Sequence, residues 1–307
     1  MKFLLFFLIL TSSVFGAEPI LPIPQYVHYD PSKAALGQRL FFDPILSRDY
    51  TISCASCHDL SKGGADGQCV STGIHAQKGI MNAPTVLNAA FNFTQFWNGR
   101  AKNLVEQALG PIHNPVEMGL SLDEAVLRIQ SDPQYRTDFL KVTGRSTVTE
   151  NDIAVMIAEY EKTLITPNGK FDLYLQRKGK LDPLEKKGYL LFKTLGCISC
   201  HNGVNVGGNS FQKMGAIVPI ERKANIDDRY SFTGRVRDKN IFKVPTLRNI
   251  AHTAPYFHDG SAATLKEAVT KMSYHNLGLK LTEIEIEALI AFLDTLSGEL
   301  TSLTVHP

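Results

Sequence analysis

Two stretches of the sequence, ISCASCH at 52–58 and GCISCH at 196–201, each contain the pattern Cys-x-x-Cys-His. The two thiols of such a pattern can add to the two vinyl groups of haem, and the histidine beside the second thiol then reaches the iron. The pattern therefore predicts two covalently bound c-type haems. The attachment residues would be Cys54, Cys57, Cys197 and Cys200, and the histidines that bind iron would be His58 and His201.

Cys-x-x-Cys pairs also occur in two other kinds of site, and the sequence argues against both. A zinc site of four cysteines needs two such pairs close together, whereas these pairs are far apart and each is followed by histidine. A thioredoxin-like redox pair needs a βαβ context that the sequence does not show. The fifth cysteine, Cys69, lies outside both patterns and is expected to be a buried or poorly reactive thiol.

The role of each haem depends on the residue that faces its iron from the side opposite the histidine. In the second half, Met272 lies on one face of an expected helix together with Leu265 and Val269. A thioether opposite histidine raises the potential of a c-type haem and suits electron transfer. Spacing favours Met272 over its main competitor, Met214, without deciding between them, and a methionine on such a face can also be a core residue.

The first half contains a different kind of segment, FWNGRAKNLVEQALGPIHNPVEMG at 96–119. It holds the only tryptophan, Trp97, together with Gln107 and Glu117. Beside an iron with an exchangeable sixth position, the Glu117 carboxylate could move a proton between the two oxygens of bound peroxide. Trp97 could carry electrons between the irons. The simpler alternatives are a loop carboxylate for Glu117 and a core aromatic for Trp97.

Helix signals dominate the elements that must position these residues. Capping residues and helical spacing predict helices after Ser121, over 151–164, after Asp182, after Thr264 and after Thr282. Alternating patterns of useful strand length are absent, so the fold is expected to be mainly α.

The polar stretch 166–180 is the expected linker between two tandem cytochrome c-like domains, each carrying one covalent haem. The domains would cover 17–166 and 167–307, with the last residues able to pack back on the first domain. Each half begins with a helix that leads into its Cys-x-x-Cys-His pattern, which is a weak internal duplication.

Residues 1–16 contain one lysine and an apolar run, followed by Val14 and Gly16 at the −3 and −1 positions of a cleavage site. They predict a removable signal peptide and export to the periplasm, which agrees with covalent haem attachment outside the cytoplasm. The apolar run is too short to span a bilayer. With a formal net charge of +2 and no long basic run, the chain lacks the electrostatic footprint of a nucleic-acid binder.

Over nearly the whole mature chain, the sequence closely resembles the bacterial di-haem cytochrome c peroxidases. The resemblance rests on an ordered set of stretches: LGQRLFFDPILS, NAPTVLNAAFN, FWNGRAKNLVEQALGPIHNPVEMG, KVPTLRNIAHTAPYFHDGS, LKEAVTKM and AFLDTLSG. It implies reduction of hydrogen peroxide to water with electrons from a small soluble donor, either a c-type cytochrome or a cupredoxin. It also implies a homodimer.

The resemblance implies a different role for each haem. The haem on His58 would be the low-potential, peroxidatic haem, with Glu117 and Gln107 as acid–base and peroxide-pocket residues. The haem on His201 would be the high-potential haem, with Met272 as its distal ligand.

Trp97 matches the tryptophan that lies between the haems in this family. A calcium ion would bridge the two domains. Its ligands would be Asn82 and the backbone carbonyls of Thr253 and Pro255.

One stretch departs from the family pattern. Many members have a distal histidine on the peroxidatic haem within Gly-His-Gly-Trp-Gln-Lys-Gly, whereas this chain reads Gly-Ile-His-Ala-Gln-Lys-Gly at 73–79. Ile74 takes the place of that histidine, and His75 comes one residue late. Three arrangements remain open: His75 binds the iron after the loop adjusts, the iron is permanently open, or His75 is a surface residue. Met81 also stands where the family often has arginine.

Two other functions remain as alternatives. A di-haem enzyme of the methylamine-utilisation type, which oxidises residues of a partner protein, would have tyrosine at the second haem, so Met272 argues against it. A non-catalytic di-haem electron carrier would have both irons saturated and would leave Glu117 and Gln107 without a chemical role.

Overall fold

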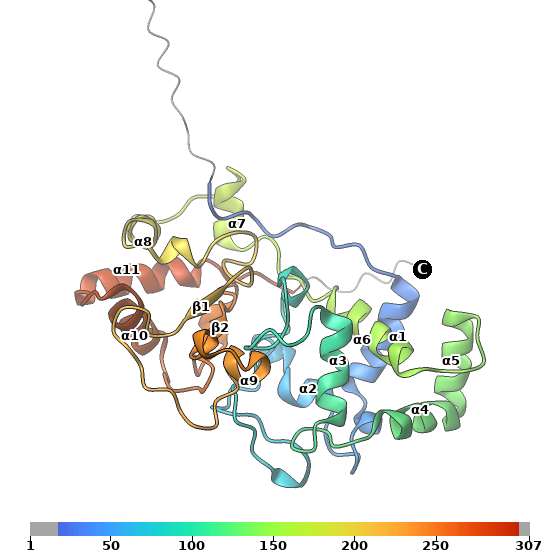
Figure 1. Ribbon diagram of the computed structural model, residues 1–307. Coiled ribbons are helices and arrows are strands. Elements are labelled where there is room, and N and C mark those ends of the chain that lie inside the picture. Colours follow the sequence, from blue (N-terminus) through green and yellow to red (C-terminus); the bar gives the residue numbers. More distant parts are fainter. Residues whose placement is uncertain (1–17, 301–307) are drawn as a thin grey trace, which may run out of the picture.

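The computed structural model describes residues 18–300 (Figure 1). Its helices are α1 (Pro31–Phe42), α2 (Cys54–Cys57), α3 (Leu104–His113), α4 (Leu122–Ser131), α5 (Pro133–Thr143), α6 (Glu150–Glu161), α7 (Lys170–Leu175), α8 (Pro183–Thr194), α9 (Arg229–Thr233), α10 (Leu265–Leu277) and α11 (Glu283–Asp294). Two short strands, β1 (Phe211–Lys213) and β2 (Ile241–Lys243), form an antiparallel pair. The prediction of a mainly α fold is confirmed. The predicted signal peptide at 1–16 and the last residues, 301–307, lie outside the described residues.

The helices begin where the capping residues predict. Thr149 and Thr282 form capping boxes with Asp152 and Glu285 at the starts of α6 and α11. Ser121 accepts a hydrogen bond from a backbone N–H in the first turn of α4, and Thr264 does the same for α10. These bonds satisfy N–H groups that have no partner inside the helix.

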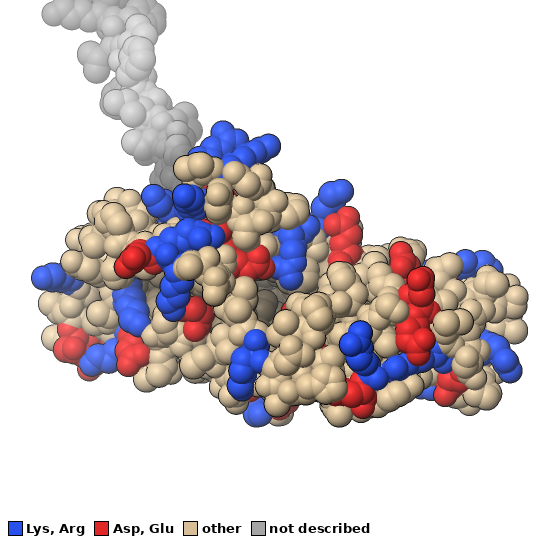
Figure 2. Space-filling model, turned by 60° about the horizontal axis from the view of Figure 1, so that its bottom comes forward, with Lys and Arg blue, Asp and Glu red and all other residues tan. Residues whose placement is uncertain are grey.

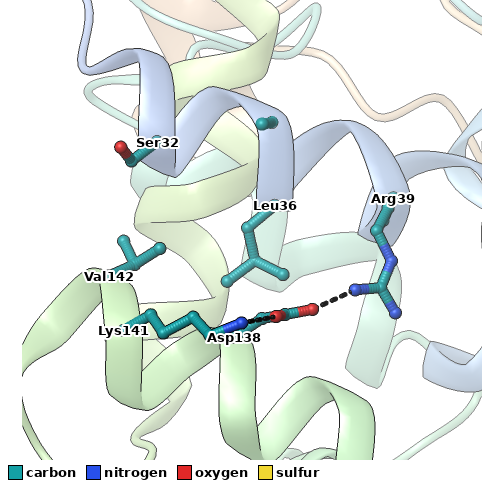
Figure 3. A pocket seen from close by; sticks show the side chains of 7 residues that line it. Ser32, Leu36, Arg39, Asp138, Lys141 and Val142 are labelled. Atoms are coloured by element: carbon teal, nitrogen blue, oxygen red, sulfur yellow. Dashed lines mark hydrogen bonds and ion pairs between the residues drawn. The ribbon is translucent and has the colours of Figure 1, made fainter.

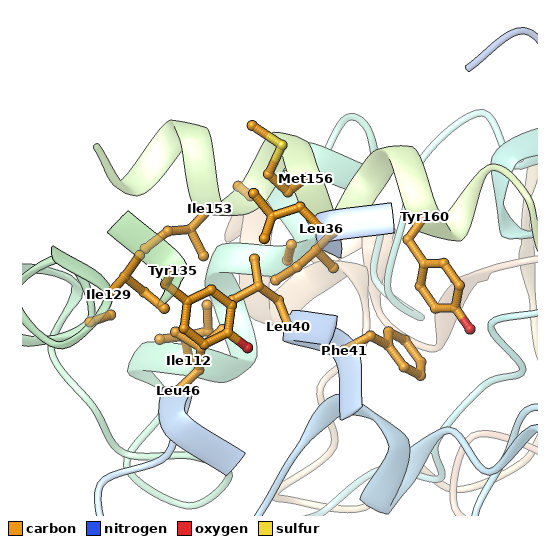
Figure 4. Packing of buried hydrophobic residues seen from close by; sticks show 14 of the residues in the cluster. Leu36, Leu40, Phe41, Leu46, Ile112, Ile129, Tyr135, Ile153, Met156 and Tyr160 are labelled. Carbon is orange, nitrogen blue, oxygen red and sulfur yellow. The ribbon is translucent and has the colours of Figure 1, made fainter. Parts of the chain in front are cut away.

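Each half of the molecule is a module built on one pair of crossing helices. In the first module, α1 to α6, apolar side chains of α1 interleave with those of α6 (Figure 4). A Cβ on Gly37 would come within 1.8 Å of the Met156 carbonyl oxygen, so only glycine lets these helices approach so closely. In the second module, which contains α7 to α11 and both strands, Gly188 of α8 approaches the Ala288 carbonyl of α11 in the same way.

The described chain begins in the second module rather than in the first. Ile20 is buried in the core around α7, α8 and α11. The Leu21 N–H donates to the Gly203 carbonyl oxygen (3.3 Å), and Arg248 Nη2 donates to the Leu21 carbonyl oxygen (2.8 Å). The chain then crosses the molecule to reach α1 (Figure 1). Residues 19–23 thus belong physically to the second module, although the expected first domain starts at residue 17.

The stretch 166–180, expected to be a linker, contains α7 and contributes to the second core. Phe171 is fully buried, with its ring centroid 5.0 Å from that of Phe292. Asp172 and Arg248 form an ion pair in which both side chains are fully buried (Oδ1 to Nη1, 2.7 Å). The polar residues of this stretch suggested a loop. The residues that bury it, Arg248 and Phe292, lie far along the chain and leave no local signal.

The two modules share more structure than the weak duplication of the sequence indicates. The segments that follow Pro84 and Pro245 trace the same path, each with a short 3₁₀ turn, then an isolated bridge, then a helix. Corresponding residues adopt the same left-handed backbone: Asn88 and Asn249 (φ 61° and 60°), Phe96 and Phe257 (64° and 72°), and Gly99 and Gly260 (71° and 63°). The helices that follow are α3 and α10.

A buried threonine joins the two modules at their corresponding asparagines. Thr166 Oγ1 accepts hydrogen bonds from Asn88 Nδ2 (2.8 Å) and from Asn249 Nδ2 (2.9 Å). Asn88 Oδ1 in turn accepts from the Thr166 N–H (2.9 Å), and Asn249 Oδ1 accepts from the Gly298 N–H (3.0 Å). All three side chains are buried.

Two backbone hydrogen bonds cross between the modules in a reciprocal pattern. The Asn82 N–H of the first module donates to the His258 carbonyl oxygen of the second (2.8 Å). The Lys243 N–H of the second module donates to the Trp97 carbonyl oxygen of the first (2.7 Å). Trp97 and His258 occupy corresponding positions of the duplicated segments, and their ring centroids are 6.2 Å apart. The modules are therefore related by an approximate twofold axis that passes between these two rings.

The surface carries charges of both signs. On the face shown in Figure 2, basic and acidic side chains are interspersed rather than gathered in a field of one sign. Within residues 18–300, no helix has the length and apolarity needed to cross a membrane.

We predict that Thr166→Val destabilises the protein by about 1–3 kcal/mol, because it leaves buried amide donors of Asn88 and Asn249 without an acceptor. Thr166→Ser is the matched control, since it keeps the hydroxyl oxygen. Denaturant unfolding of the haem-loaded proteins would measure the difference. Equal stabilities of the valine and serine variants would contradict the role given to this oxygen.

Candidate functional site

The two Cys-x-x-Cys-His patterns fold into matching turns. The first forms α2, and the second forms the 3₁₀ turn Cys197–Ser199. In each turn the histidine N–H donates to the carbonyl oxygen of the first cysteine, at 3.0 Å for His58 to Cys54 and 3.0 Å for His201 to Cys197. The turn thus presents two thiols and one imidazole together, as covalent haem attachment requires.

Both histidines are oriented for metal binding by a backbone carbonyl. His58 Nδ1 lies 3.2 Å from the Gly64 carbonyl oxygen, and His201 Nδ1 lies 3.2 Å from the Val206 carbonyl oxygen. Because a carbonyl can only accept, Nδ1 must carry the proton, and Nε2 keeps its lone pair for iron. A bond of this kind is the usual way in which proteins fix a histidine ligand.

The four motif cysteines are free and half-buried, so they form no disulfide that would compete with haem attachment. Cys69 is free but exposed, so the expectation of a buried thiol there is wrong. Burial raises the pKa of Cys54 to about 12 and that of Cys57 to about 11. Burial likewise raises the pKa of Cys197 to about 11. The donor set, two thiols and one Nε2 in each module, fits a c-type haem in both.

Glu117 lies in the turn after α3, close to the first motif. Its Oε1 accepts a hydrogen bond from Asn114 Nδ2 (2.7 Å), and its carbonyl oxygen accepts one from the Ile74 N–H (2.8 Å). Its carboxylate is near enough to Cys57 to raise the pKa of that thiol. The structure therefore places Glu117 beside the haem attachment site of the first module.

Opposing influences act on the pKa of Glu117. Burial raises it above the usual value, whereas the Arg100 guanidinium and the Asn114 hydrogen bond lower it. Arg100 stacks over the Phe96 ring at 3.5 Å and pairs with Asp227 Oδ2 at 2.8 Å. Since Asp227 belongs to the second module, both modules contribute charge to the surroundings of this carboxyl group.

Gln107 lies on α3, on the face that leads to the Glu117 turn. Residues 107, 110, 111 and 114 share this face because of their helical spacing. A Cβ on Gly110 would lie 2.9 Å from the Phe96 ring, so that ring packs against the same face. Gln107 and Glu117 are thus brought to one side of the first module.

His75 points away from this site, and Ile74 points toward it. The Ile74 side chain is buried, and a Cβ on Gly119 would come within 2.3 Å of its Cδ1. His75 has a left-handed backbone (φ 53°) and a side chain that is 61% exposed, with Nδ1 3.6 Å from Asp49 Oδ2. In this conformation His75 is a surface residue.

Trp97 lies at the boundary between the modules. Its Nε1–H donates to the Asn82 carbonyl oxygen (2.9 Å), and its own carbonyl accepts from Lys243. On the other side, the His258 ring stacks on the Phe242 ring of β2, with centroids 4.2 Å apart. Aromatic rings therefore continue from the first module into the second.

Met272 lies on α10 and Met214 follows β1, and both elements belong to the second module. Leu265 and Val269, on the face of α10 that also carries Met272, pack against the core that includes Cys197. The segment after Met214 is tied to the end of α10, where the Gly215 N–H donates to Asn276 Oδ1 (3.0 Å). The face of α10 that carries Met272 therefore packs against the core of the second module.

Two successive parts of the chain match two known protein families. The family described as di-haem cytochrome c peroxidase matches residues 31–180, and that described as cytochrome c matches residues 185–297. The cytochrome c551 peroxidase of Nitrosomonas europaea is 50% identical over 283 residues, which is 92% of this chain and 85% of that protein. The chain belongs to the bacterial di-haem cytochrome c peroxidase family.

Two further relatives support this membership. The cytochrome c peroxidase Ccp of Escherichia coli is 45% identical over 92% of this chain and 62% of its own length. The crystal structure of a MauG-like protein associated with microbial copper homeostasis has a TM-score of 0.81 at 30% identity, covering 93% of this chain and 95% of that one. The predicted architecture of two tandem cytochrome c-like modules is confirmed.

The residues expected to hold calcium lie at the module boundary. Asn82 is buried, and its Nδ2 donates to the Gln68 carbonyl oxygen (2.8 Å), which leaves Oδ1 as its available oxygen. The stretch that contains Thr253 and Pro255 lies against Gly63 of the first module. These donors are neutral oxygens, the ligand type that calcium accepts. Residues 18–300 contain no cluster of three or more His, Cys, Asp or Glu side chains that could hold a metal ion.

A hollow of about 220 Å³ between α1 and α5 lies outside this site (Figure 3). Asp138 bridges Arg39 (2.5 Å) and Lys141 (3.6 Å) at its edge, and apolar side chains such as Leu36 line the rest. None of the haem-binding or peroxide-pocket residues reaches it, so it is a surface feature of helix packing.

Sequence reasoning missed three residues that shape the site. Arg100 and Asp227 act on Glu117 by charge, and Asn114 holds its carboxylate directly. The ion pair of Arg100 with Asp227 joins distant parts of the chain, so no local sequence pattern predicts it. The Asn-Pro turn at 114–115 was visible, but the direction of its amide was not.

Proposed function

We propose that the protein is a di-haem cytochrome c peroxidase that reduces hydrogen peroxide to two molecules of water with two electrons and two protons. The observation that carries the proposal is the partly buried Glu117, held by Asn114 beside the first haem attachment site with its pKa raised by burial. A raised pKa suits a carboxyl group that must both accept and donate a proton. Membership of the peroxidase family supports the same reaction.

Glu117 would take a proton from the near oxygen of peroxide and deliver it to the departing oxygen. Gln107, on the adjacent face of α3, would orient peroxide by hydrogen bonding. Arg100 would favour the ionised form of Glu117, because its charge opposes the effect of burial. When bound, the haem supplies the iron at which the O–O bond breaks and the electrons needed to break it.

Electrons would enter at the second module and leave through the first. Met272 would complete the ligation of the haem at His201 and raise its potential. Trp97, whose ring faces His258 and whose backbone is bonded to Lys243, would form part of the path between the modules. The donor would be a small c-type cytochrome or a cupredoxin, and the protein would act in the periplasm as a homodimer.

The first haem would have an open sixth position in the resting enzyme. Ile74 occupies the inward place of the loop, and an isoleucine side chain cannot bind iron. His75 instead lies at the surface near Asp49. Peroxide would therefore reach the iron without a prior reductive step.

One calcium ion would stabilise the contact between the modules. Asn82 Oδ1 would be its side-chain ligand, and Thr253 and Pro255 would supply carbonyl oxygens. The support is their common position beside residues 63–68.

Glu117→Gln should retain both haems and lower peroxide turnover by about 10²–10⁴-fold, because the amide cannot shuttle the proton. Steady-state oxidation of a reduced donor would measure the loss. Glu106→Gln, at an exposed position of α3, the helix before the Glu117 turn, is the control and should turn over normally. Normal turnover in Glu117→Gln would sink the assigned role.

His75→Ala should leave the optical spectrum of the oxidised protein and its reaction with peroxide unchanged, because this side chain points to Asp49 and solvent. Stopped-flow absorbance of the oxidised protein, without added reductant, would test both points. His28→Ala, another exposed histidine, controls for surface effects. A low-spin to high-spin change on replacing His75 would instead establish it as an iron ligand.

Asn82→Ala should weaken calcium binding to the haem-loaded protein, since it removes the one side-chain oxygen of the site. Isothermal titration calorimetry with calcium alone would compare it with wild type and with Asn151→Ala, which removes an exposed asparagine of α6. Equal affinities in all three would exclude Asn82 as a ligand.

A further inference from the structure

Lys243 is a buried cation without a protein counter-ion. Its side chain is only 5% exposed, and burial alone lowers its pKa to about 8. No carboxylate among the described residues pairs with it. An unpaired charge in the interior costs several kcal/mol, so such a group calls for a partner that the chain itself does not supply.

The other buried cation of the second module shows what compensation looks like. Arg248 is fully buried, and Asp172 pairs with it at 2.7 Å. Lys243 is only a few residues away in sequence, yet it has no such carboxylate. The second module therefore neutralises one buried cation internally and leaves the other for an external anion.

Lys243 lies next to the segment that orients the His201 imidazole. It ends β2, and the next residues pack on the segment that orients His201: Gly208 N–H donates to the Val244 carbonyl oxygen (2.8 Å), and a Cβ on Gly207 would meet the Pro245 carbonyl oxygen at 2.1 Å. Val206, whose carbonyl binds His201 Nδ1, comes immediately before these glycines. The Lys243 N–H is also bonded to the Trp97 carbonyl, so the residue faces the module boundary.

Comparison of equivalent positions in the two modules shows that this cation occurs only in the second module. The position that corresponds to Lys243 in the first module is Asn82, as the reciprocal bonds to Trp97 and His258 show. The asparagine side chain is neutral, so the chain itself supplies a buried cation at this position only in the second module.

Haem brings two propionate carboxylates, and these are the anions that the second site would receive. We propose that Lys243 forms an ion pair with a propionate of the haem attached to Cys197 and Cys200. The pair neutralises the lysine and places a compensated carboxylate at the edge of this haem. Cancelling the negative charge of one propionate disfavours the more positive, oxidised iron, so the pair also raises the potential of this haem.

This inference rests on haem attachment in the second module and not on peroxide chemistry. The two are therefore tested by different measurements. Loss of turnover in a Glu117 variant would leave the potential of the second haem unchanged, and a shift of that potential in a Lys243 variant says nothing about proton transfer at the first.

The test is a spectroelectrochemical titration of the haem-loaded protein with Lys243→Met, Lys243→Gln and Lys243→Arg. Both neutral variants should shift the midpoint potential of the second haem to lower values, and the arginine variant should stay close to wild type. Resonance Raman spectra should show a change in the propionate-bending band of that haem in the neutral variants alone. Two neutral variants are used so that poor folding of one leaves the other to decide.

Lys213→Met is the matched control. It removes the same charge from the other strand of the same sheet, but at an exposed position. It should leave the potential and the propionate band unchanged. Unchanged potentials and propionate bands in folded, fully haem-loaded Lys243→Met or Lys243→Gln would overturn the proposal, as would an equal shift in Lys213→Met.

Discussion

The hydroxyl oxygen of Thr166 accepts hydrogen bonds from Asn88 and Asn249, and these two bonds position the two modules relative to each other. Each asparagine starts the duplicated segment of its own module, so one shared acceptor fixes where both segments begin. The loops that follow must then meet near the same axis, which brings the Trp97 ring to 6.2 Å from that of His258. A polar group so deeply buried tolerates little displacement, because losing either partner leaves an amide unsatisfied.

The same scaffold, used twice, carries different chemistry through a few substitutions at equivalent positions. Tryptophan in one module corresponds to histidine in the other, and Asn82 corresponds to Lys243. The backbone around these side chains is alike, so the differences between the two haem sites come from what the side chains bring rather than from how the chain is folded. Glu117 is an exception, because it lies in a turn after α3, whereas α10 continues beyond the corresponding point and ends at Leu277.

Much of the fold could be predicted from sequence because its signals are local. Capping residues such as Thr149 and Thr282 act on the N–H groups next to them, and the haem motifs need only five consecutive residues. Helix α7 was missed because the buried Asp172–Arg248 pair joins residues distant in sequence. The outward direction of His75 depends on a left-handed φ at a non-glycine residue, which no composition rule predicts.

The position of residues 19–23 bears on the order in which the chain can fold. They are among the earliest residues to be synthesised, yet their partners Gly203 and Arg248 come near the end. Domains tend to fold from the N-terminus during synthesis. The first module can therefore fold before residues 19–23 have any partner to pack against. The second module completes its core only when Ile20 returns to it. A fragment that begins after residue 166 would lack Ile20, which belongs to its own core. The two halves are therefore not separable cytochromes but one interlocked unit.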